Sequence, residues 1–457
     1  MRMAMLATAA LVAVTAGAGM GSGLTLKPCE IHGVQAKCGT FVVPENRAKP
    51  NRRTIGLHVV VLPAWSKPVA KDPVTYLAGG PGLGATQLAA GLGQAWVALN
   101  AHHDILLVDQ RGTGRSNAYS CPKPKTPIDT TAQLQSYTRA CLSAFGGDMT
   151  QYGTRMAMDD LDAVRAALGY PQLDVVGGSY GATAAQVYLE LHPSSVRTLT
   201  LEGASAIDVP FFAHFAVNAQ RALDELARFC HSQPSCRKAF PGWERRFGEL
   251  VKTWNAQPVH TRTGATTTGD QLASVVHSML LDVNKAISIP LVVSRAAVGD
   301  YAPLNRQGNG DLGVSPQIMY WSIWCNEPWA GLGAKGPWGT DFDGYTTAFI
   351  ALLRRGCTYF PKRTEPRAQW TFPSSRRVPV LAVEGGADPQ DPATNLPGLK
   401  QHFAHSRTVI IPHAGHEFDI SGCVNRIDTS FIDRGTTTGL DTSCLSSAVT
   451  PQFVVTG

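Results

Sequence analysis

The sequence predicts an α/β fold in which a mostly parallel β-sheet is covered by helices on both faces and interrupted by a helical insertion. Between residues 54 and 202, short apolar segments alternate with segments whose apolar residues recur at helical spacing. The apolar segments are continuous, which is typical of parallel strands that are buried on both faces. From residue 206 to about 375 the pattern is mostly helical, and strand patterns return only after it.

The composition of the 457-residue chain agrees with a globular protein. Hydrophobic residues make up 44% of the sequence and charged residues only 16%, which excludes a disordered chain. No short repeat runs through the sequence, so collagen-like and coiled-coil chains are excluded as well. The 40 basic and 34 acidic residues give a net charge of +6 without a Lys/Arg cluster, and we therefore expect no nucleic-acid partner.

The first residues have the pattern of an export signal. A short basic start precedes an apolar stretch of small residues, and Ala-Gly-Ala at 16–18 offers the small side chains that signal peptidase reads. We expect residues 1–18 to be a signal peptide and the mature protein to be secreted or periplasmic. An N-terminal anchor helix is the alternative, although Thr and Gly interrupt the run. No later segment approaches 18 uninterrupted apolar residues, so we expect no stable membrane insertion of the mature chain.

The ten cysteines fall in five pairs along the sequence, and none has the C-x-x-C spacing of zinc or thioredoxin-like redox sites. An even number of cysteines in a chain with an export pattern favours their oxidation to disulfides. We hypothesise that each cysteine pairs with its neighbour along the chain. The predicted pairs are Cys29–Cys38, Cys121–Cys141, Cys230–Cys236, Cys325–Cys357 and Cys423–Cys444.

The order of the patterns divides the chain into a core in two parts and an insertion. Residues 19–205 and 376–457 are predicted to form the core, and residues 206–375 a helical lid. A helix pattern in the core, MAMDDLDAVRAALGY, has Gly169 where a helix C-terminal cap belongs, and the clearest amphipathic patterns of the insertion are AVNAQRALDELARFC, GDQLASVVHSML and TTAFIALLRRG. Strands are expected at TIGLHVVVLP, PVTYL, HDILLV, LDVVGG, VRTLTLEG, VPVLAVEG and RTVIIP, and a closing helix at about 423–433.

The sharpest local feature is the sequence Gly177-Gly178-Ser179-Tyr180-Gly181. A GxSxG match is weak by itself in a chain with 45 glycines, but here it follows a buried-strand pattern and precedes a helix pattern. A sharp strand-to-helix turn needs small neighbours and projects the serine hydroxyl above the sheet edge. It also aims the backbone N–H of Tyr180 at the position of a substrate oxyanion. We therefore predict Ser179 as a nucleophile; a glycine-rich turn with a structural serine is the alternative.

A serine nucleophile needs a base and a group that orients the base. After the insertion, one strand pattern leads into a turn with Asp388 and Asp391, and the next leads into a turn with His413 and His416. Both turns follow strands at the edge where a parallel sheet places its ligands. Asp388 is preferred because it lies closer to the strand end, and His416 is preferred because Gly415 frees its loop to turn inward.

The second oxyanion donor is expected in the sequence AGGPG at 78–82, where missing side chains let the Gly80 N–H approach a tetrahedral intermediate. A phosphate-binding loop is excluded there because neither GxGxxG nor GxxxxGK[ST] is present. Acyl transfer through a serine requires no metal or organic cofactor, and we expect none. A dehalogenase or epoxide hydrolase with an Asp nucleophile is disfavoured, because serine occupies the turn.

Taken in order, AGGPG, DQRGTGRS, GGSYG, GGADP and AGH resemble the motifs of the α/β-hydrolase superfamily. Within it, the chain is similar to the secreted prolyl and tripeptidyl aminopeptidase branch of serine exopeptidases. The resemblance covers nearly all of the mature chain but is thin across the insertion. It implies an α/β-hydrolase fold with Ser179 as nucleophile, Asp388 as orienter, His416 as base, and the N–H groups of Gly80 and Tyr180 as oxyanion hole. That branch often has His before GGPG, where this chain has alanine.

One stretch of the insertion, WSIWCNEPW, suggests a binding site for a free amine. An exopeptidase must hold the α-ammonium group of its substrate, and a partly buried carboxylate among aromatic side chains can do so. A similar Cys-Asn-Glu segment recurs in the aminopeptidase branch, so we predict Glu327 as the amine anchor, fixed by a Cys325–Cys357 disulfide. A structural glutamate is the alternative. Glu202, which ends the strand after the elbow helix, is a second candidate for substrate binding.

Together these features predict an exported serine hydrolase, and more specifically an aminopeptidase that releases N-terminal residues or short peptides through an acyl-enzyme. A carboxylesterase or lipase is the alternative, because the same three residues cleave esters. A catalytically silent binding protein is the third class. The expected partner is a peptide or small ester substrate, and the sequence makes no prediction of the oligomeric state.

Overall fold

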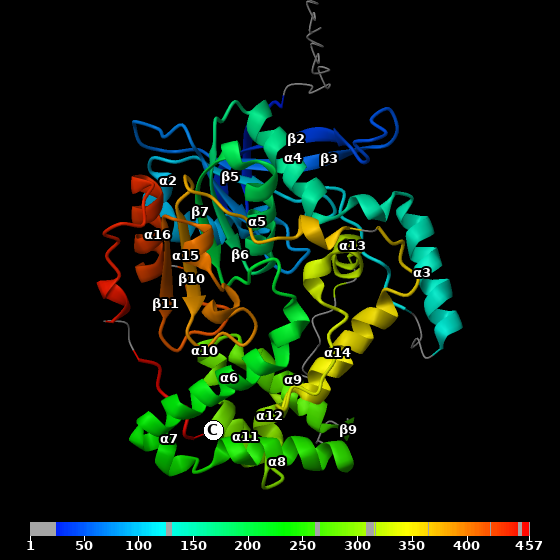
Figure 1. Ribbon diagram of the computed structural model, residues 1–457, viewed down its shortest axis with the longest axis vertical. Coiled ribbons are helices and arrows are strands. Elements are labelled where there is room, and N and C mark those ends of the chain that lie inside the picture. Colours follow the sequence, from blue (N-terminus) through cyan, green and yellow to red (C-terminus); the bar gives the residue numbers. More distant parts are fainter. Residues whose placement is uncertain are drawn as a thin grey trace, which may run out of the picture.

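A nine-stranded sheet organises the protein (Figure 1). The computed structural model describes residues 24–124, 130–260, 266–307, 315, 317–363, 365–420, 422–446 and 450–456. The predicted signal peptide, residues 1–18, lies outside these ranges. The strands of the sheet are β1 (Lys27–Ile31), β2 (Val34–Pro44), β3 (Thr54–Leu62), β4 (Val74–Leu77), β5 (Ile105–Val108), β6 (Leu173–Gly178), β7 (Val196–Glu202), β10 (Val380–Gly385) and β11 (Ser406–Ile411).

The strand order is β1-β2-β3-β5-β4-β6-β7-β10-β11. The six strands from β5 to β11 run parallel to one another, and β1 to β3 extend the sheet as antiparallel strands. In the middle of the sheet, Val175 of β6 lies opposite Thr75 of β4 and Leu199 of β7. The prediction of a mostly parallel sheet is confirmed.

Helices cover both faces of this sheet, which explains why its central strands are apolar throughout. All six residues of β6 are buried. Val175 packs in a cluster with residues of α4 (Thr154–Ala167) and α5 (Tyr180–Leu191). Its neighbour Val176 faces the other way, into a cluster with residues of α1 (Ala89–Ala95), α2 (Val97–Asn100) and α16 (Gly422–Arg434). Each strand therefore buries two apolar faces.

The chain between β7 and β10 is mostly helical, and we call it the helical segment. Figure 1 shows most of its helices grouped at one end of the sheet. Its elements are α6 (Phe211–Ser232), α7 (Pro234–Ala239), α8 (Trp243–Ala256), β8 (Val259–His260), β9 (Thr266–Thr267), α9 (Gly269–Leu280), α10 (Val283–Ala286), α11 (Ile289–Ala296), α12 (Ala302–Asn305), α13 (Ile318–Asn326) and α14 (Asp343–Gly356). The lid boundaries expected at 206 and 375 stay a prediction. Two further helices, α3 (Thr131–Phe145) and α15 (Leu399–His402), lie outside this segment.

Five disulfides close local loops, and they are the five that the sequence predicts. Cys325–Cys357 joins the end of α13 to the residue after α14 inside the helical segment. Cys423–Cys444 connects α16 to the tail that follows it. The other three bonds are Cys29–Cys38, Cys121–Cys141 and Cys230–Cys236.

Many of the helices are amphipathic, whereas the short α13 is apolar nearly all round. The longest of them, α6, has 22 residues and carries charged side chains such as Arg221 and Asp224 along its length. Within the described ranges, none of the helices is both long and apolar enough to cross a membrane. The same ranges contain no group of three or more His, Cys, Asp or Glu side chains arranged to hold a metal ion.

Candidate active site

Ser179 occupies a sharp turn between strand β6 and helix α5. Its backbone has φ 55° and ψ −126°, a conformation that L-residues rarely adopt. The turn is close-packed on both sides of the serine. A Cβ atom on Gly177 would lie 2.3 Å from the Gly181 carbonyl oxygen, and one on Gly181 would lie 1.9 Å from the Leu77 carbonyl oxygen. Glycine is therefore required at both positions, and the strained turn lifts the serine hydroxyl above the sheet edge.

The structure brings Ser179, His416 and Asp388 into one hydrogen-bonded chain. His416 Nε2 lies 2.9 Å from Ser179 Oγ, and His416 Nδ1 lies 2.8 Å from Asp388 Oδ2. The second Asp388 oxygen, Oδ1, accepts the backbone N–H groups of Gln390 and Asp391 at 2.7 and 2.9 Å. Because both carboxylate oxygens have partners, the buried Asp388 side chain is held in one orientation toward the imidazole.

The two competing residues of the sequence analysis lie near this chain but outside it. His413 stacks on Phe229 of α6 with ring centroids 3.7 Å apart, so its ring contacts the helical segment. Asp391 Oδ2 lies 3.9 Å from His416 Nδ1, beyond hydrogen-bond distance. The residues preferred from the sequence are thus the ones that meet at Ser179.

The electrostatics of the site favour a protonated histidine next to an ionised aspartate. Burial alone lowers the pKa of His416, but the negative Asp388, its hydrogen bond and the nearby Asp391 together raise it above the usual histidine range. Burial opposes ionisation of Asp388, yet the charge and hydrogen bond of His416 hold the pKa of this carboxyl below its ordinary value. The pair therefore stabilises the imidazolium that forms when the histidine accepts a proton.

The predicted oxyanion donors border the same position. The loop after β4 approaches the serine so closely that a Cβ on Gly79 would lie 3.1 Å from Ser179 Cβ. Gly80 has φ +111°, a conformation that favours glycine. Tyr180 is the first residue of α5, so its N–H has no acceptor within the helix. Gly80 and Tyr180 both line the cavity into which Ser179 faces.

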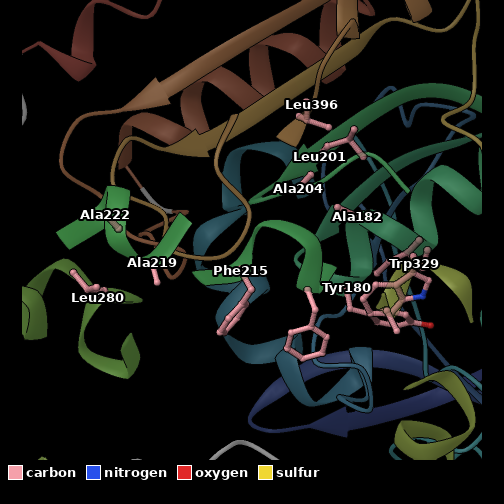
Figure 2. Packing of buried hydrophobic residues seen from close by; sticks show 14 of the residues in the cluster. Tyr180, Ala182, Leu201, Ala204, Phe215, Ala219, Ala222, Leu280, Trp329 and Leu396 are labelled. Atoms are coloured by element: carbon pink, nitrogen blue, oxygen red, sulfur yellow. The ribbon is translucent and has the colours of Figure 1, made fainter. Parts of the chain in front are cut away.

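Two hollows meet at Ser179. The first, which we call the aromatic cavity, has a volume of about 240 Å³ and lies between the turn and the helical segment. Tyr180 and Trp329 lie side by side in its wall, with ring centroids 6.0 Å apart (Figure 2). The aromatic side chains contributed by the helical segment are Phe211, Tyr320, Trp324, Trp329, Tyr345 and Phe349.

The second hollow, the His416 groove, adjoins the aromatic cavity at the serine. The two share Gly80, Ser179, Leu281 and Gln390, but His416 lines only the groove. Its remaining walls are apolar side chains and a few acidic ones, from the loop after β4, the end of β7 and the turn after β11. These residues include Leu83, Leu88, Glu202, Glu417, Phe418 and Ile420.

A model of the family described as alpha/beta hydrolase fold matches residues 73–421. The chain belongs to this family. The match spans the sheet from β4 onward, the helical segment, the serine turn and the Asp388 and His416 turns. A hydrolase fold and the strained serine turn thus coincide in one chain, as the motif order implied.

Curated relatives of this hydrolase carry peptidase names. The tripeptidyl aminopeptidase of Streptomyces lividans is 28% identical over 186 residues, which are 36% of this chain and 35% of that protein. The serine protease Hip1 of Mycobacterium tuberculosis is 26% identical over 245 residues, 48% of this chain and 47% of that protein. The proline iminopeptidase of Neisseria gonorrhoeae is 32% identical over 131 residues, 29% of this chain and 32% of that protein. The matched segments cover a third to a half of these relatives.

The structure does not bring Glu327 to the aromatic cavity. Its Oε1 accepts the Thr154 backbone N–H at 2.6 Å, and its Oε2 accepts Thr154 Oγ1 and Trp329 Nε1, each at 2.8 Å. Burial, and then the neighbouring Glu365, raise the pKa of Glu327 to about 8. The side chain thus hydrogen-bonds Thr154 and Trp329 outside the cavity lining, and its role as an amine anchor stays a prediction.

Glu202 lines the His416 groove and is not part of the aromatic cavity lining. Its Oε2 accepts the Tyr76 hydroxyl at 3.3 Å, and burial raises the pKa of Glu202 to about 7. Burial, followed by the charge of Glu202, also raises the pKa of Asp428 on α16. A role for Glu202 in substrate binding stays a prediction, and its position restricts that role to the groove.

Sequence reasoning missed several residues that shape the site. Leu281, after α9, accepts the Glu417 N–H at 2.7 Å and so supports the turn that carries His416. His277 of α9 and Trp324 of α13 line the aromatic cavity, each with a buried ring nitrogen that has no hydrogen-bond partner in the structure. Burial lowers the pKa of His277 to about 3, so its ring is neutral. No motif distinguishes these residues, because ordinary amphipathic helices carry them.

Proposed function

We propose that this hydrolase is a serine aminopeptidase, which cleaves the amide bond after the N-terminal part of a peptide through an acyl-enzyme. The observation that supports it is the hydrogen-bonded chain of Ser179, His416 and Asp388 at the mouth of a cavity enclosed by the helical segment. Three relatives with peptidase names also support a peptidase, and the aligned segments cover a third to a half of each of them. The helical segment would then act as a lid.

The two hollows suggest how a substrate lies across the serine. A general acid must stand beside the leaving group, because it gives that group its proton. His416 lines the groove and not the aromatic cavity, so the groove suits the leaving group and the cavity the acyl part. The helical segment forms much of the wall of the aromatic cavity, which limits the room for the acyl part. A cavity of this kind favours an exopeptidase over an endopeptidase.

The mechanism follows from the distances. His416 Nε2 accepts the Ser179 proton, and Ser179 Oγ attacks the substrate carbonyl carbon. The N–H groups of Gly80 and Tyr180 stabilise the oxyanion, while Asp388 stabilises the imidazolium. His416 then protonates the leaving amine, which departs through the groove. Water, deprotonated by His416, hydrolyses the acyl-enzyme and restores the serine.

We also propose that the protein is exported. Five disulfides support an oxidising compartment, because disulfides form and persist there. The signal-peptide pattern at residues 1–18 supports the same conclusion. N-terminal sequencing of the protein recovered outside the cytoplasm tests this, and a first residue near 19 is the expected result.

One comparison of substrates tests the activity. The purified protein receives an amide reporter with a free N-terminus, the same reporter with an acetylated N-terminus, and a short-chain ester. We expect the free-amine amide to be cleaved, acetylation to abolish cleavage, and a fluorophosphonate to label Ser179. Turnover of the ester alone would indicate a carboxylesterase instead. Absence of both turnover and labelling would indicate a binding protein.

A further inference from the structure

Asp391 lines the aromatic cavity, and its two carboxylate oxygens differ in their partners. Its Oδ1 accepts the Ser205 hydroxyl at 2.5 Å. Its Oδ2 makes no hydrogen bond to any part of the chain that the structure describes, and it lies 3.9 Å from His416 Nδ1. The side chain is 11% exposed, and Asp391 and Ser205 both line the cavity. One oxygen is therefore open to a donor on a ligand, while the other is held in place by Ser205.

The surroundings of this oxygen favour a cation. Among the described residues that line the aromatic cavity, Asp391 carries the one carboxylate, and none is Lys or Arg. A charged group in a mostly apolar cavity costs free energy unless a partner of opposite charge pairs with it. The rings of Trp324 and Trp329 add faces that attract a cation. A primary ammonium group satisfies both requirements.

The place of Asp391 limits the length of the acyl part. The α-ammonium of the residue that is attacked lies two bonds from the carbonyl carbon, and each additional residue moves the ammonium about 3.3–3.6 Å further away. Asp391 Oδ2 lies 3.9 Å from His416 Nδ1, directly beside the hydrogen-bonded chain that reaches Ser179. The ammonium of a tripeptide would lie about 7 Å beyond that of a single residue. A carboxylate this close to His416 suits the amine of one residue better than an amine about 7 Å further away.

Asp391 and Glu327 differ in whether a carboxylate oxygen remains available to a ligand. Each is a buried acid near the aromatic cavity. Both oxygens of Glu327 accept hydrogen bonds from the protein itself, and Glu327 is not part of the cavity lining. Asp391 lines the cavity and keeps one oxygen unpaired. An amine in the cavity can therefore contact the carboxylate of Asp391 but not that of Glu327.

We infer that Asp391 binds the α-ammonium group of the substrate, and that the aromatic cavity holds the apolar side chain of that same residue. The inference rests on the proposed aminopeptidase function and makes it specific: the enzyme removes one N-terminal residue at a time. Ser205 orients the carboxylate through its hydrogen bond.

The test measures kcat and KM for four substrates: a leucine coumarin amide, its N-acetyl form, a tripeptide coumarin amide that ends in leucine, and 4-nitrophenyl acetate. The ester has no amine, so its hydrolysis reports on the Ser179 machinery and on folding. The variants are Asp391→Asn, Asp391→Thr and Glu327→Gln. Glu249→Gln, at an exposed helix position, controls for the loss of a negative charge.

We expect the wild-type enzyme to prefer the leucine amide over the tripeptide amide. Asp391→Asn and Asp391→Thr should lower kcat/KM for the leucine amide, relative to the ester, by about 10- to 100-fold, mainly through KM. Dividing by the ester rate removes any effect that acts through His416, because both substrates share that residue. Glu249→Gln should leave this ratio unchanged.

Three results would overturn the inference. An equal loss for amide and ester would show that Asp391 acts through His416 or the fold. A preference for the tripeptide amide would show that the amine lies deeper in the cavity. An amine-specific loss in Glu327→Gln, and not in the Asp391 variants, would assign the anchor to Glu327. Failure of the proposed function is distinct, because the wild-type protein would then cleave the ester and no free-amine amide.

Discussion

The sheet core and the helical segment contribute to the site in different ways. The core supplies Ser179, Asp388 and His416 from turns at strand ends, where backbone contacts leave almost no freedom. The helical segment supplies most of the aromatic wall of the cavity, through side chains on several helices. The three hydrogen-bonded side chains are thus fixed by the backbone, whereas the cavity wall is made of side chains that can change without altering the sheet.

The two regions are nevertheless joined at the His416 turn. A Cβ atom added to Gly415 would lie 2.2 Å from the Leu280 carbonyl oxygen and 2.4 Å from the Leu281 carbonyl oxygen. The Leu281 carbonyl oxygen also accepts the Glu417 N–H. The helical segment therefore supports the turn that carries His416 as well as lining the aromatic cavity.

The largest expected effect is a loss of activity without a loss of stability. Ser179→Ala should lower kcat by about 10⁴-fold or more, because it removes the nucleophile. The melting temperature should not fall, because alanine keeps the Cβ of serine and the substitution removes only the hydroxyl. Activity on the leucine amide and thermal unfolding provide the measurement. Residual activity within about 10-fold of wild type would contradict the assignment of Ser179.

A second prediction tests how rigid the core turn is. Gly181→Ala places a Cβ 1.9 Å from the Leu77 carbonyl oxygen and should reduce the free energy of unfolding by about 3 kcal/mol. Gly91→Ala is the matched control, because nothing lies within 4 Å of its added Cβ and Gly91 lies within α1. The control should be stabilising by up to about 1 kcal/mol. Equal effects in urea unfolding would show that the turn is not close-packed.

Disulfides allow the two regions to be loosened separately. Replacing Cys325 and Cys357 by alanine opens a 32-residue loop in the helical segment and should cost about 3.7 kcal/mol, whereas the 9-residue loop of Cys29–Cys38 should cost about 2.6 kcal/mol. We expect the first change to raise KM as well, because α13 carries cavity residues. The second should alter stability alone. A change in KM in the Cys29–Cys38 variant would contradict the expectation that, of the two disulfides, only the one in the helical segment affects the cavity.

The smallest expected effect is a shift in pH dependence. Only neutral imidazole can act as the base, so kcat/KM should fall as the pH drops through the pKa of His416. Asp388 and Asp391 raise that pKa, which places the acid-side midpoint above the ordinary histidine value of 6.5. Asp391→Asn removes one negative charge, lowers this pKa, and should move the midpoint to lower pH in the ester assay. An unchanged midpoint would show that Asp391 does not influence His416.

Local patterns predicted much of the fold and of the site. The continuous apolar strands, Gly169 at a helix end and the GxSxG turn are local features, since each depends on neighbours within one element. The choice of Asp388 and His416 used strand ends, which parallel topology brings to one edge. The five disulfide pairs followed from proximity along the chain.

The residues that line the cavity could not be predicted in this way. Glu327 lies among aromatic residues in the sequence, which suggested an amine site, but the fold turns its carboxylate toward Thr154. Asp391 was considered only as a competitor of Asp388, because sequence cannot show that one of its oxygens remains open to a cavity. Hydrogen-bond partners far apart in the chain decided both cases.

By itself, the sequence determined the local parts of the site: a serine on a strained turn, an aspartate and a histidine at later strand ends, and cysteines that pair with their neighbours. The tertiary structure alone decided which carboxylate lines the aromatic cavity and which of the two hollows the histidine borders. The physical reason is the distance along the chain between the residues that specify each feature. A turn is specified by the sterics of a few adjacent residues, whereas a cavity is the space left where helices of the inserted segment pack against strands encoded before and after it.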